Sequence, residues 1–146
     1  MIKMNDKRNP GIVMRFYRME RWLYLHGMKF LANIIFRLIY LVFNCYIAPT
    51  VDIGEDVSIA HGIGIVLHQN SVIGSGSTIY QNVTLGNANG PKIGKNCVLG
   101  AGCVILGDIV IGDNCRIGAN AVVLKDVPDG ATAVGVPARI ILCEDE

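Results

Sequence analysis

An aliphatic residue recurs every sixth position through most of this chain, with two breaks in the spacing. Seven of these residues are followed directly by Gly. A period of six fits neither a helix nor a single strand, and it is typical of a parallel β-helix whose units each form a short strand and a corner. We therefore expect a mainly β fold in which three units complete one coil. The thirteen positions are Ile47, Ile53, Ile59, Ile65, Ile73, Ile79, Leu85, Ile93, Leu99, Ile105, Ile111, Ile117 and Val123.

The spacing breaks between Ile65 and Ile73 and again between Leu85 and Ile93, where eight residues replace six. Each break inserts two residues, so we expect a bulge or loop to project from the coil there. The second, at Gly86–Pro91, is rich in turn-forming residues. A purely structural repeat does not need such breaks, and loops often carry function, so both breaks are candidate functional positions.

Small or β-branched residues recur four positions after the aliphatic ones, and we expect them to point inward as well. Cys97 and Cys115 are eighteen residues apart and should stack in successive coils, with Cys103 in the same slot of the next face. No CxxC pair or Cys/His cluster is present. Buried thiols acting as small hydrophobic groups are therefore favoured over a nucleophile or a disulfide. The eight positions are Val51, Val57, Val83, Cys97, Cys103, Cys115, Ala121 and Val127.

The sequence before the repeats favours two helices, Ile12–His26 with Gly27 as its stop and about Met28–Asn44. We expect a helical segment at residues 1–45, the β-helix at 46–139 and a tail at 140–146. The first segment is too short for a core of its own. Its helices should pack on the β-helix or on a neighbouring subunit.

Charge is divided unevenly along the chain. Residues 1–45 carry eight Lys/Arg against two carboxylates, giving +6, and the remainder carries five against ten, giving −5. We expect Arg15, Arg18 and Arg21 to form a solvated helix face, and we expect no nucleic-acid partner. Peripheral membrane contact through residues 28–48 stays an open alternative, although the uncharged run Leu38–Val51 is too short to span a bilayer. Because no secretory signal precedes Arg21, we expect a cytoplasmic protein.

The repeats contain two histidines, His61 and His68. His61 follows a buried aliphatic residue by two and lies between small residues, which suits a general base as well as it suits a hydrogen-bonded corner histidine. One coil plus a two-residue break leads from His61 to Gln81. We therefore predict that Gln81 or Asn82 stacks beside it and binds it or a substrate, with His68 as a reserve candidate. No nucleophile elbow, P-loop or HExxH motif is present.

Several segments together resemble the serine acetyltransferases of the hexapeptide-repeat acyltransferase superfamily. The resemblance implies a left-handed β-helix, a homotrimer with active sites between adjacent subunits, acetyl-CoA as co-substrate, no metal, and His61 as the general base. It further implies a CoA wall at Ala101, Gly102, Lys125, Gly135, Pro137 and Arg139. The segments are Ile59–Gly64, Gln81–Gly86, Pro91–Gly94, Leu99–Gly102 and Gly135–Arg139.

The chain departs from that family where the family binds serine. Tyr46 stands where an Asp orients the base, Ala60 where an Asp helps hold serine, and Gly90 where a loop histidine is expected. The first 45 residues also replace a much longer helical domain. The acceptor therefore stays open between serine and a sugar hydroxyl of capsule or exopolysaccharide synthesis. The non-enzymatic alternative is a β-helical scaffold or binding protein, including a metal-binding relative that would need three converging histidines.

Overall fold

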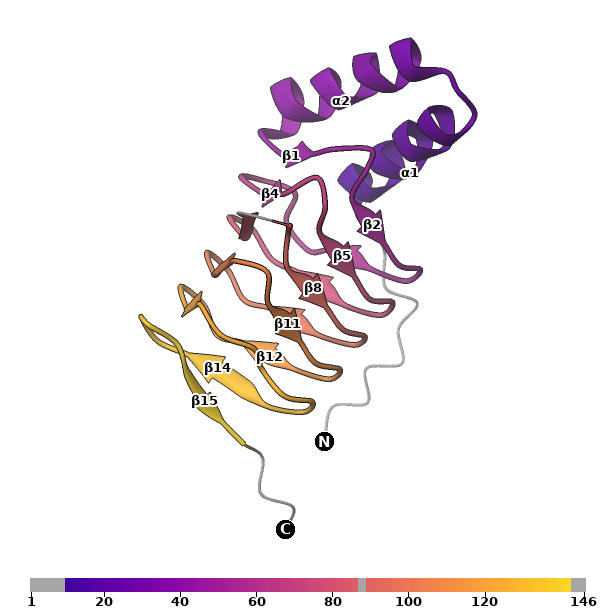
Figure 1. The fold of residues 1–146 in the computed structure, drawn as a ribbon. Helices are drawn as coiled ribbons and strands as arrows, with labels where there is room; N and C mark the ends of the chain where they lie inside the picture. The colour runs from indigo at the N-terminus through magenta and orange to yellow at the C-terminus, as the bar shows by residue number, and fades with distance from the viewer. Residues whose placement is uncertain (1–9, 87–88, 143–146) are drawn as a thin grey trace.

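The protein is a parallel β-helix with two helices at one end (Figure 1). The computed structural model describes residues 10–86 and 89–142. Helices α1 (Ile12–Leu25) and α2 (Lys29–Phe43) agree with the expected helices to within one or two residues. The chain then passes through three parallel sheets in turn, and only the last strand, β15, runs antiparallel to its neighbour.

Each sheet forms one face of the prism. Sheet A contains β1 (Tyr46–Ile47), β4 (Val66–Leu67), β7 (Thr84–Gly86), β10 (Val104–Leu106) and β13 (Val122–Val123). Sheet B contains β2 (Asp52–Ile53), β5 (Val72–Ile73), β8 (Lys92–Ile93) and β11 (Val110–Ile111). Sheet C contains β3 (Ser58–Ile59), β6 (Thr78–Ile79), β9 (Val98–Leu99), β12 (Arg116–Ile117), β14 (Thr132–Val134) and β15 (Arg139–Ile141).

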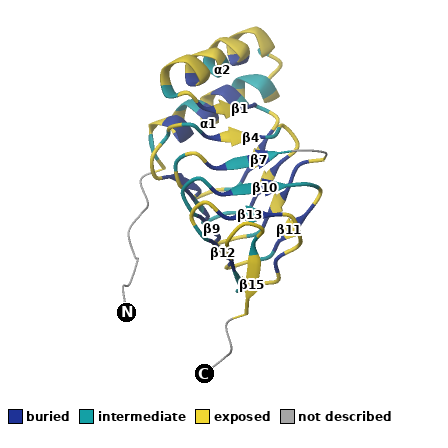
Figure 2. Cartoon of the chain, turned by 90° about the vertical axis from the view of Figure 1, so that its left-hand side faces the viewer, coloured by how far each residue is buried: buried dark blue, intermediate teal, exposed yellow. Residues whose placement is uncertain are grey.

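All thirteen repeat residues are buried, and so are the eight small residues expected to accompany them. Because side chains of a strand alternate between faces, the neighbours of the buried residues point outward and leave a thin aliphatic core. In Figure 2 buried residues (dark blue) lie along the coils among teal and yellow ones. The prediction of the core from the six-residue period is confirmed.

The cysteines in the repeats pack as predicted. The Val98 N–H donates to the Cys115 carbonyl at 3.0 Å, so Cys97 and Cys115 stand in adjacent coils. The Cys97 thiol also donates to the Gly112 carbonyl at 3.1 Å. Burial raises the pKa of Cys97 to about 11 and that of Cys103 to about 12, so both stay protonated near neutral pH. Cys143 lies outside the described residues.

The first break in the repeat lies one turn earlier than predicted. Leu67, not Ile65, pairs with Ile47 above it and Leu85 below it. Ile65 instead sits at the corner, where its carbonyl accepts the Tyr46 N–H at 2.7 Å. The two inserted residues therefore lie in the turn between β3 and β4, which contains His61. The period could not separate the two registers because Ile65 and Leu67 are both aliphatic and both fully buried. The second break, between Leu85 and β8, is confirmed.

The turns between sheets stack into three edges. We call the turns from sheet C to sheet A the His61 edge, and those from sheet A to sheet B the His68 edge. The third edge joins sheet B to sheet C. The His61 edge comprises residues 60–65, 80–83, 100–103 and 118–121, and the turn 135–138 between β14 and β15 continues it below. The His68 edge includes residues 68–71, 89–91, 107–109 and 124–126.

Asn and Gly alternate down the His61 edge at positions with positive φ. A Cβ added to Gly64 would overlap Asn82 Oδ1, and one added to Gly102 would overlap Asn120 Oδ1. Each Asn side chain therefore fills the space left by the Gly of the coil above, and both residue types tolerate left-handed backbone. The column is Asn44 (φ 52°), Gly64 (φ 67°), Asn82 (φ 58°), Gly102 (φ 69°) and Asn120 (φ 56°).

Helix α1 caps the upper edge of sheet B, whose first strand has no coil above it. Arg18 and Arg21 donate to backbone carbonyls of this edge, so the expectation that they form a solvated face is wrong. Arg21 also forms an ion pair with Asp52 at 2.9 Å. The donors and acceptors are Tyr17 Oη to Val51 O, Arg18 Nη1 to Ile53 O (2.8 Å), Arg18 Nη2 to Gly54 O, and Arg21 Nη1 to Pro49 O and Val51 O (both 2.9 Å).

The other free strand edges are covered too. The Ile59 N–H of β3 donates to the Pro10 carbonyl at 3.2 Å, and α2 lies against β1. At the lower end β15 pairs with β14, and the Ala138 N–H donates to the Val122 carbonyl at 2.8 Å. The tail expected from residue 140 thus overlaps a strand that closes sheet C.

Glu20 of α1 is fully buried, and neither of its carboxyl oxygens has a hydrogen-bond partner within the described residues. It lies one turn beyond Phe16 and Tyr17, on the face of α1 that packs inward. Desolvation raises the pKa of Glu20 to about 8. The folded protein therefore holds a neutral carboxyl group there at pH 7.

We expect folding stability to fall as the pH rises from about 5 to 8, because the folded state keeps the Glu20 proton while the unfolded state, with its ordinary pKa of 4.5, releases it. Glu20→Gln should remove this dependence, which we put on the order of 3–5 kcal/mol. Urea unfolding at pH 5 and pH 9 measures it. Glu55→Gln, at an exposed carboxylate, is the control. A wild-type curve as flat as that of Glu20→Gln would contradict the assignment.

Candidate active site

His61 lies in the turn that carries the two inserted residues, in the first coil below the helices. Its backbone is fixed from above, since Gly62 packs closely against Val13 of α1 and the Gly64 N–H donates to the Asn44 carbonyl at 3.1 Å. Its imidazole is exposed and makes no hydrogen bond within the described residues. The nearest ring is that of Tyr80, with centroids 6.4 Å apart. The fold thus fixes the backbone around His61 and leaves its imidazole exposed, without a hydrogen-bond partner in the described chain.

Gln81 lies in the next coil, beneath His61. The Ala60 N–H donates to the Ile79 carbonyl at 2.9 Å and the Asn82 N–H to the Ile63 carbonyl at 3.0 Å, so these bonds bracket the two turns. The predicted stacking of Gln81 under His61 therefore agrees with the register. Gln81 Oε1 is buried without a hydrogen-bond partner in the described part of the chain. A buried unpaired amide oxygen is costly, so a donor reaching Gln81 from outside the described chain would stabilise it.

Asn82 has a structural role, because its side chain packs under Gly64 in the Asn/Gly column. It remains exposed. Its predicted contact with substrate stays a prediction.

Most of the residues predicted to bind CoA continue down the same edge. The Gly102 N–H donates to the Gln81 carbonyl at 2.9 Å, and the Asn120 N–H donates to the Ala101 carbonyl at 2.8 Å. Gly135 follows below, where its carbonyl accepts the Val122 N–H at 3.0 Å. Pro137 belongs to the same turn and Arg139 begins β15 beside it. His61, Gln81 and this wall thus form one line along the prism.

Lys125 does not belong to that line. It follows β13 and lies on the His68 edge, across sheet A from His61. Within one chain it is therefore separated from the other five predicted CoA residues by the width of a sheet.

His68 also lies on the far side of sheet A. It is half-buried, its Nδ1 accepts the Asn70 N–H at 3.2 Å, and it lines a groove of about 200 Å³. Gly90 lies one coil below Asn70 and Ser71 of the same turn, since a Cβ there would stand 2.7 Å from Asn70 C and Ser71 N. His61 and His68 therefore occupy opposite ends of β4 and do not converge within one chain. The groove is lined by Tyr46, Val66, His68, Gln69, Leu85 and Gly86.

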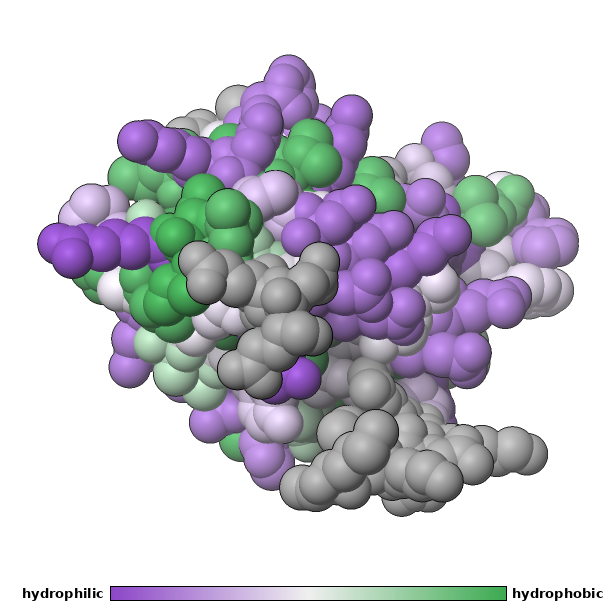
Figure 3. Space-filling model, turned by 90° about the horizontal axis from the view of Figure 1, so that it is seen from below, coloured by the Kyte–Doolittle hydropathy of each residue, from purple (hydrophilic) through white to green (hydrophobic). Residues whose placement is uncertain are grey.

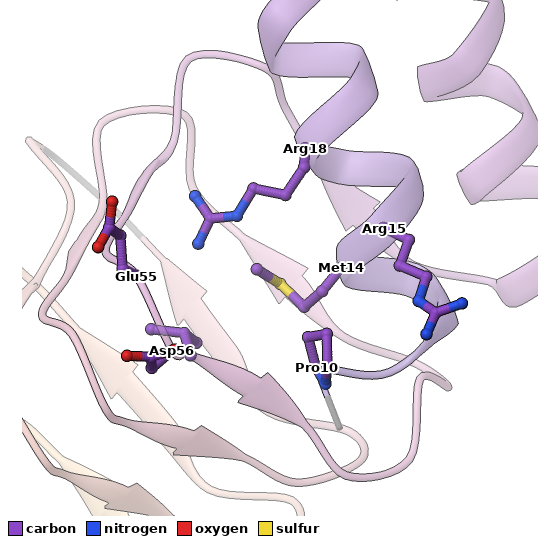
Figure 4. A pocket seen from close by; sticks show the side chains of 7 residues that line it. Pro10, Met14, Arg15, Arg18, Glu55 and Asp56 are labelled. Atoms are coloured by element: carbon purple, nitrogen blue, oxygen red, sulfur yellow. The ribbon is translucent and has the colours of Figure 1, made fainter. Parts of the chain in front are cut away.

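A larger cavity, of about 660 Å³, lies elsewhere, between α1 and the third edge (Figure 4). Arg18 and the carboxylates Glu55 and Asp56 border it, while Arg15 points away from them. The Arg18 guanidinium is already bound to two carbonyls of β2 and its turn. The described lining of this cavity contains no histidine, and the cavity was not foreseen from the sequence. We place the candidate site at His61 because of the residues that share its edge.

No cluster of three or more His, Cys, Asp or Glu side chains suited to a metal ion occurs within residues 10–86 and 89–142. The two repeat histidines lie on different edges, as described above.

Comparison with known proteins points to the serine acetyltransferases. The bacterial transferase hexapeptide family (six repeats) matches residues 90–125. A serine acetyltransferase of Synechocystis is 42% identical over 139 residues, covering 90% of this chain and 56% of the relative. That of Helicobacter pylori strain J99 is 40% identical over 139 residues and covers 90% of this chain and 81% of the relative. The chain thus spans about half the length of the Synechocystis relative and most of the Helicobacter one.

Solved structures give the same result. A serine acetyltransferase in complex with CoA superposes with a TM-score of 0.84 at 41% identity, covering 88% of this chain and 55% of that one. The serine acetyltransferase of Neisseria gonorrhoeae in complex with serine gives 0.82 at 36% identity, with coverage of 88% and 55%. The β-helix is accordingly the left-handed form that the resemblance implied. With 40% identity over most of the length of both chains, this protein belongs to the serine acetyltransferase family of hexapeptide-repeat transferases.

Proposed function

We propose that the chain catalyses acetyl transfer from acetyl-CoA to the hydroxyl group of serine. The observation that supports this most is the line of residues on the His61 edge. The turn of His61 lies one coil above that of Gln81, whose Oε1 is buried and unpaired, and Ala101, Gly102 and Gly135 continue below. The relatives named serine acetyltransferase, one with CoA and one with serine, support the donor and the acceptor.

In the proposed reaction His61 removes the proton of the serine hydroxyl while that oxygen attacks the thioester carbonyl. The resulting tetrahedral oxyanion is stabilised by a backbone N–H of the glycine-rich turns. It collapses with loss of the CoA thiolate, which takes the proton back from His61. O-acetylserine and CoA leave, and no acyl-enzyme is needed. The described cysteines are buried, with raised thiol pKa values, and are unsuited to act as nucleophiles.

We further propose that the working site forms between adjacent copies of a homotrimer. His61 has no hydrogen-bond partner to orient its ring in the described chain, and Lys125 and His68 lie on the other edge of sheet A. Packing the His61 edge of one copy against the His68 edge of the next would join both sets. Asn70 stands one coil above Gly90, where the family places a loop histidine. His68 belongs to the same turn as Asn70 and can supply the missing imidazole from there.

A sugar hydroxyl is the second candidate acceptor, and three residues favour it. Ala60 and Tyr46 lack the carboxylates that the family uses near serine, and Gly90 lacks the imidazole. Ala60 and Tyr46 are both exposed, so neither position is closed to a larger acceptor. The donor, base and CoA wall are the same in both proposals.

The acceptor is tested by thiol release from acetyl-CoA with L-serine, L-homoserine and nucleotide-linked sugars, each at millimolar concentration. We expect turnover with serine, identified as O-acetylserine by mass spectrometry. Turnover with sugars alone would transfer the assignment to the second candidate. An enzyme preparation that binds CoA but releases no thiol with any of these acceptors would contradict both.

His61→Ala should lower kcat by about 10²–10⁴-fold, the usual contribution of a general base, with the KM for acetyl-CoA nearly unchanged. Steady-state thiol release measures both constants. His26→Ala is the matched control, because His26 is an exposed histidine at the end of α1 that contacts only Trp22. Near-normal turnover of His61→Ala would remove His61 from the reaction.

Mixing two inactive variants tests whether the site forms between copies. Trimers of His61→Ala or of His68→Ala alone should be slow, whereas trimers reassembled from an equal mixture should regain about a quarter of wild-type activity, because about a quarter of the interfaces then receive both intact side chains. Thiol release before and after co-refolding gives the ratio. Failure of the mixture to exceed its components would argue for two sites within single chains or for no part of His68 in the reaction.

A further inference from the structure

Helix α2 presents an apolar face to solvent. It is the outermost layer at the upper end of the prism and is largely exposed along its length (Figure 2). Only Ala32 and Ile39 of its fifteen residues are buried. Phe30 and Leu41 on the opposite side are 77% and 78% exposed. The residues that form this apolar face of α2 are Phe30, Leu31, Ile34, Leu38, Leu41 and Val42, which recur at helical spacing on one side.

The two helices that form this layer are cationic. No Asp or Glu occurs between Arg21 and Val51, and Glu20 is buried. Lys29 and Arg37 of α2 are exposed, and neither has an ion-pair partner among the described residues. The one described ion pair, between Arg21 and Asp52, joins α1 to the β-helix. The layer therefore combines an apolar stripe with unpaired positive charge and offers no exposed carboxylate.

That combination fits an anionic lipid surface better than a second copy of the chain. Two copies packed through this face would bring Lys29 and Arg37 toward like charges, with no carboxylate in the layer to pair them. An anionic bilayer supplies both an apolar layer for the stripe and negative headgroups for the cations. None of the helices in the described ranges is long and apolar enough to cross a membrane, so the helix would lie in the interface.

The opposite end of the molecule is mixed in character. Seen from below, hydrophilic side chains cover much of the described surface, and an apolar patch lies beside the residues drawn in grey (Figure 3). Val136, Ile141 and Leu142 are exposed at this end. A β-helix standing on its helical end would bring the first coil, with His61, close to the bilayer.

We propose that the apolar face of α2, together with Lys29 and Arg37, docks the protein peripherally on membranes rich in anionic lipids. This goes beyond the proposed acetyl transfer and does not depend on it, because lipid binding is measured without acetyl-CoA or acceptor.

Co-sedimentation of the full chain with vesicles tests the proposal, comparing phosphatidylcholine alone with phosphatidylcholine containing roughly 30% phosphatidylglycerol at about 0.1 M salt. We expect binding to the anionic vesicles that weakens in high salt. Phe30→Ser/Leu41→Ser should lower the affinity tenfold or more, because it removes two apolar side chains that would enter the bilayer and leaves the charge of the protein unchanged. Asn33→Ser, on the polar side of the same helix, is the matched control and should bind like wild type.

A second pair of variants separates the effect of the charges on α2 from the effect of the protein's net charge on vesicle binding. Lys29→Gln/Arg37→Gln should weaken binding to anionic vesicles by roughly tenfold. Lys95→Gln/Arg116→Gln removes the same charge from exposed positions on the prism and should have little effect. Thiol release and circular dichroism confirm that each variant is folded.

Two outcomes would overturn the proposal. One is equal binding of wild type and Phe30→Ser/Leu41→Ser to anionic vesicles. The other is absence of vesicle binding combined with light scattering that shows larger assemblies of wild type dissolved by Phe30→Ser/Leu41→Ser. The second result would assign the face to contact between copies.

Discussion

Every coil of this β-helix depends on its neighbours for its backbone hydrogen bonds. Strands of two or three residues have no other source of pairing, and the bonds between coils are continuous from β1 to β13. The first and last coils therefore leave polar edges that something must cover. Here the side chains of Arg18 and Arg21, the carbonyl of Pro10 and helix α2 cover the upper end, and β15 covers sheet C below. The N-terminal segment is thus part of the β-helix in energetic terms, although it is too short to fold on its own.

The fold could be predicted from the sequence because the period of six is a local pattern with a single physical solution. Each aliphatic residue predicted to be buried is buried. Register was harder to predict, since Ile65 and Leu67 are chemically alike and only their pairing with Cys45–Ile47 in the coil above separates them. Arg18 and Arg21 were misassigned for a related reason. A helical pattern shows which residues share a face, but it does not show that backbone carbonyls lie opposite that face.

The residues of the candidate site could be named from the sequence, but their arrangement in the fold could not. His61, Gln81 and the wall below them fall on one edge because the coil length returns the chain to the same corner. The buried Oε1 of Gln81 and the unpartnered ring of His61 emerge only from the packing. Likewise, Lys125 and His68 were predicted to act together with residues of the His61 edge, but sheet A separates them from that edge. The proposed site joins two copies because the residues predicted to act in it divide between two edges of one prism.

The alternation of Asn and Gly down the His61 edge makes residues far apart in the sequence depend on one another. Asn120 fills the space that Gly102 leaves open, and Asn82 does the same for Gly64. A side chain gained at one level must therefore be matched by one lost at the level next to it. Divergence at this edge should proceed by compensating exchanges between neighbouring coils. Among related sequences such paired changes would report the coil register directly, including the shift at His61 that a single sequence conceals.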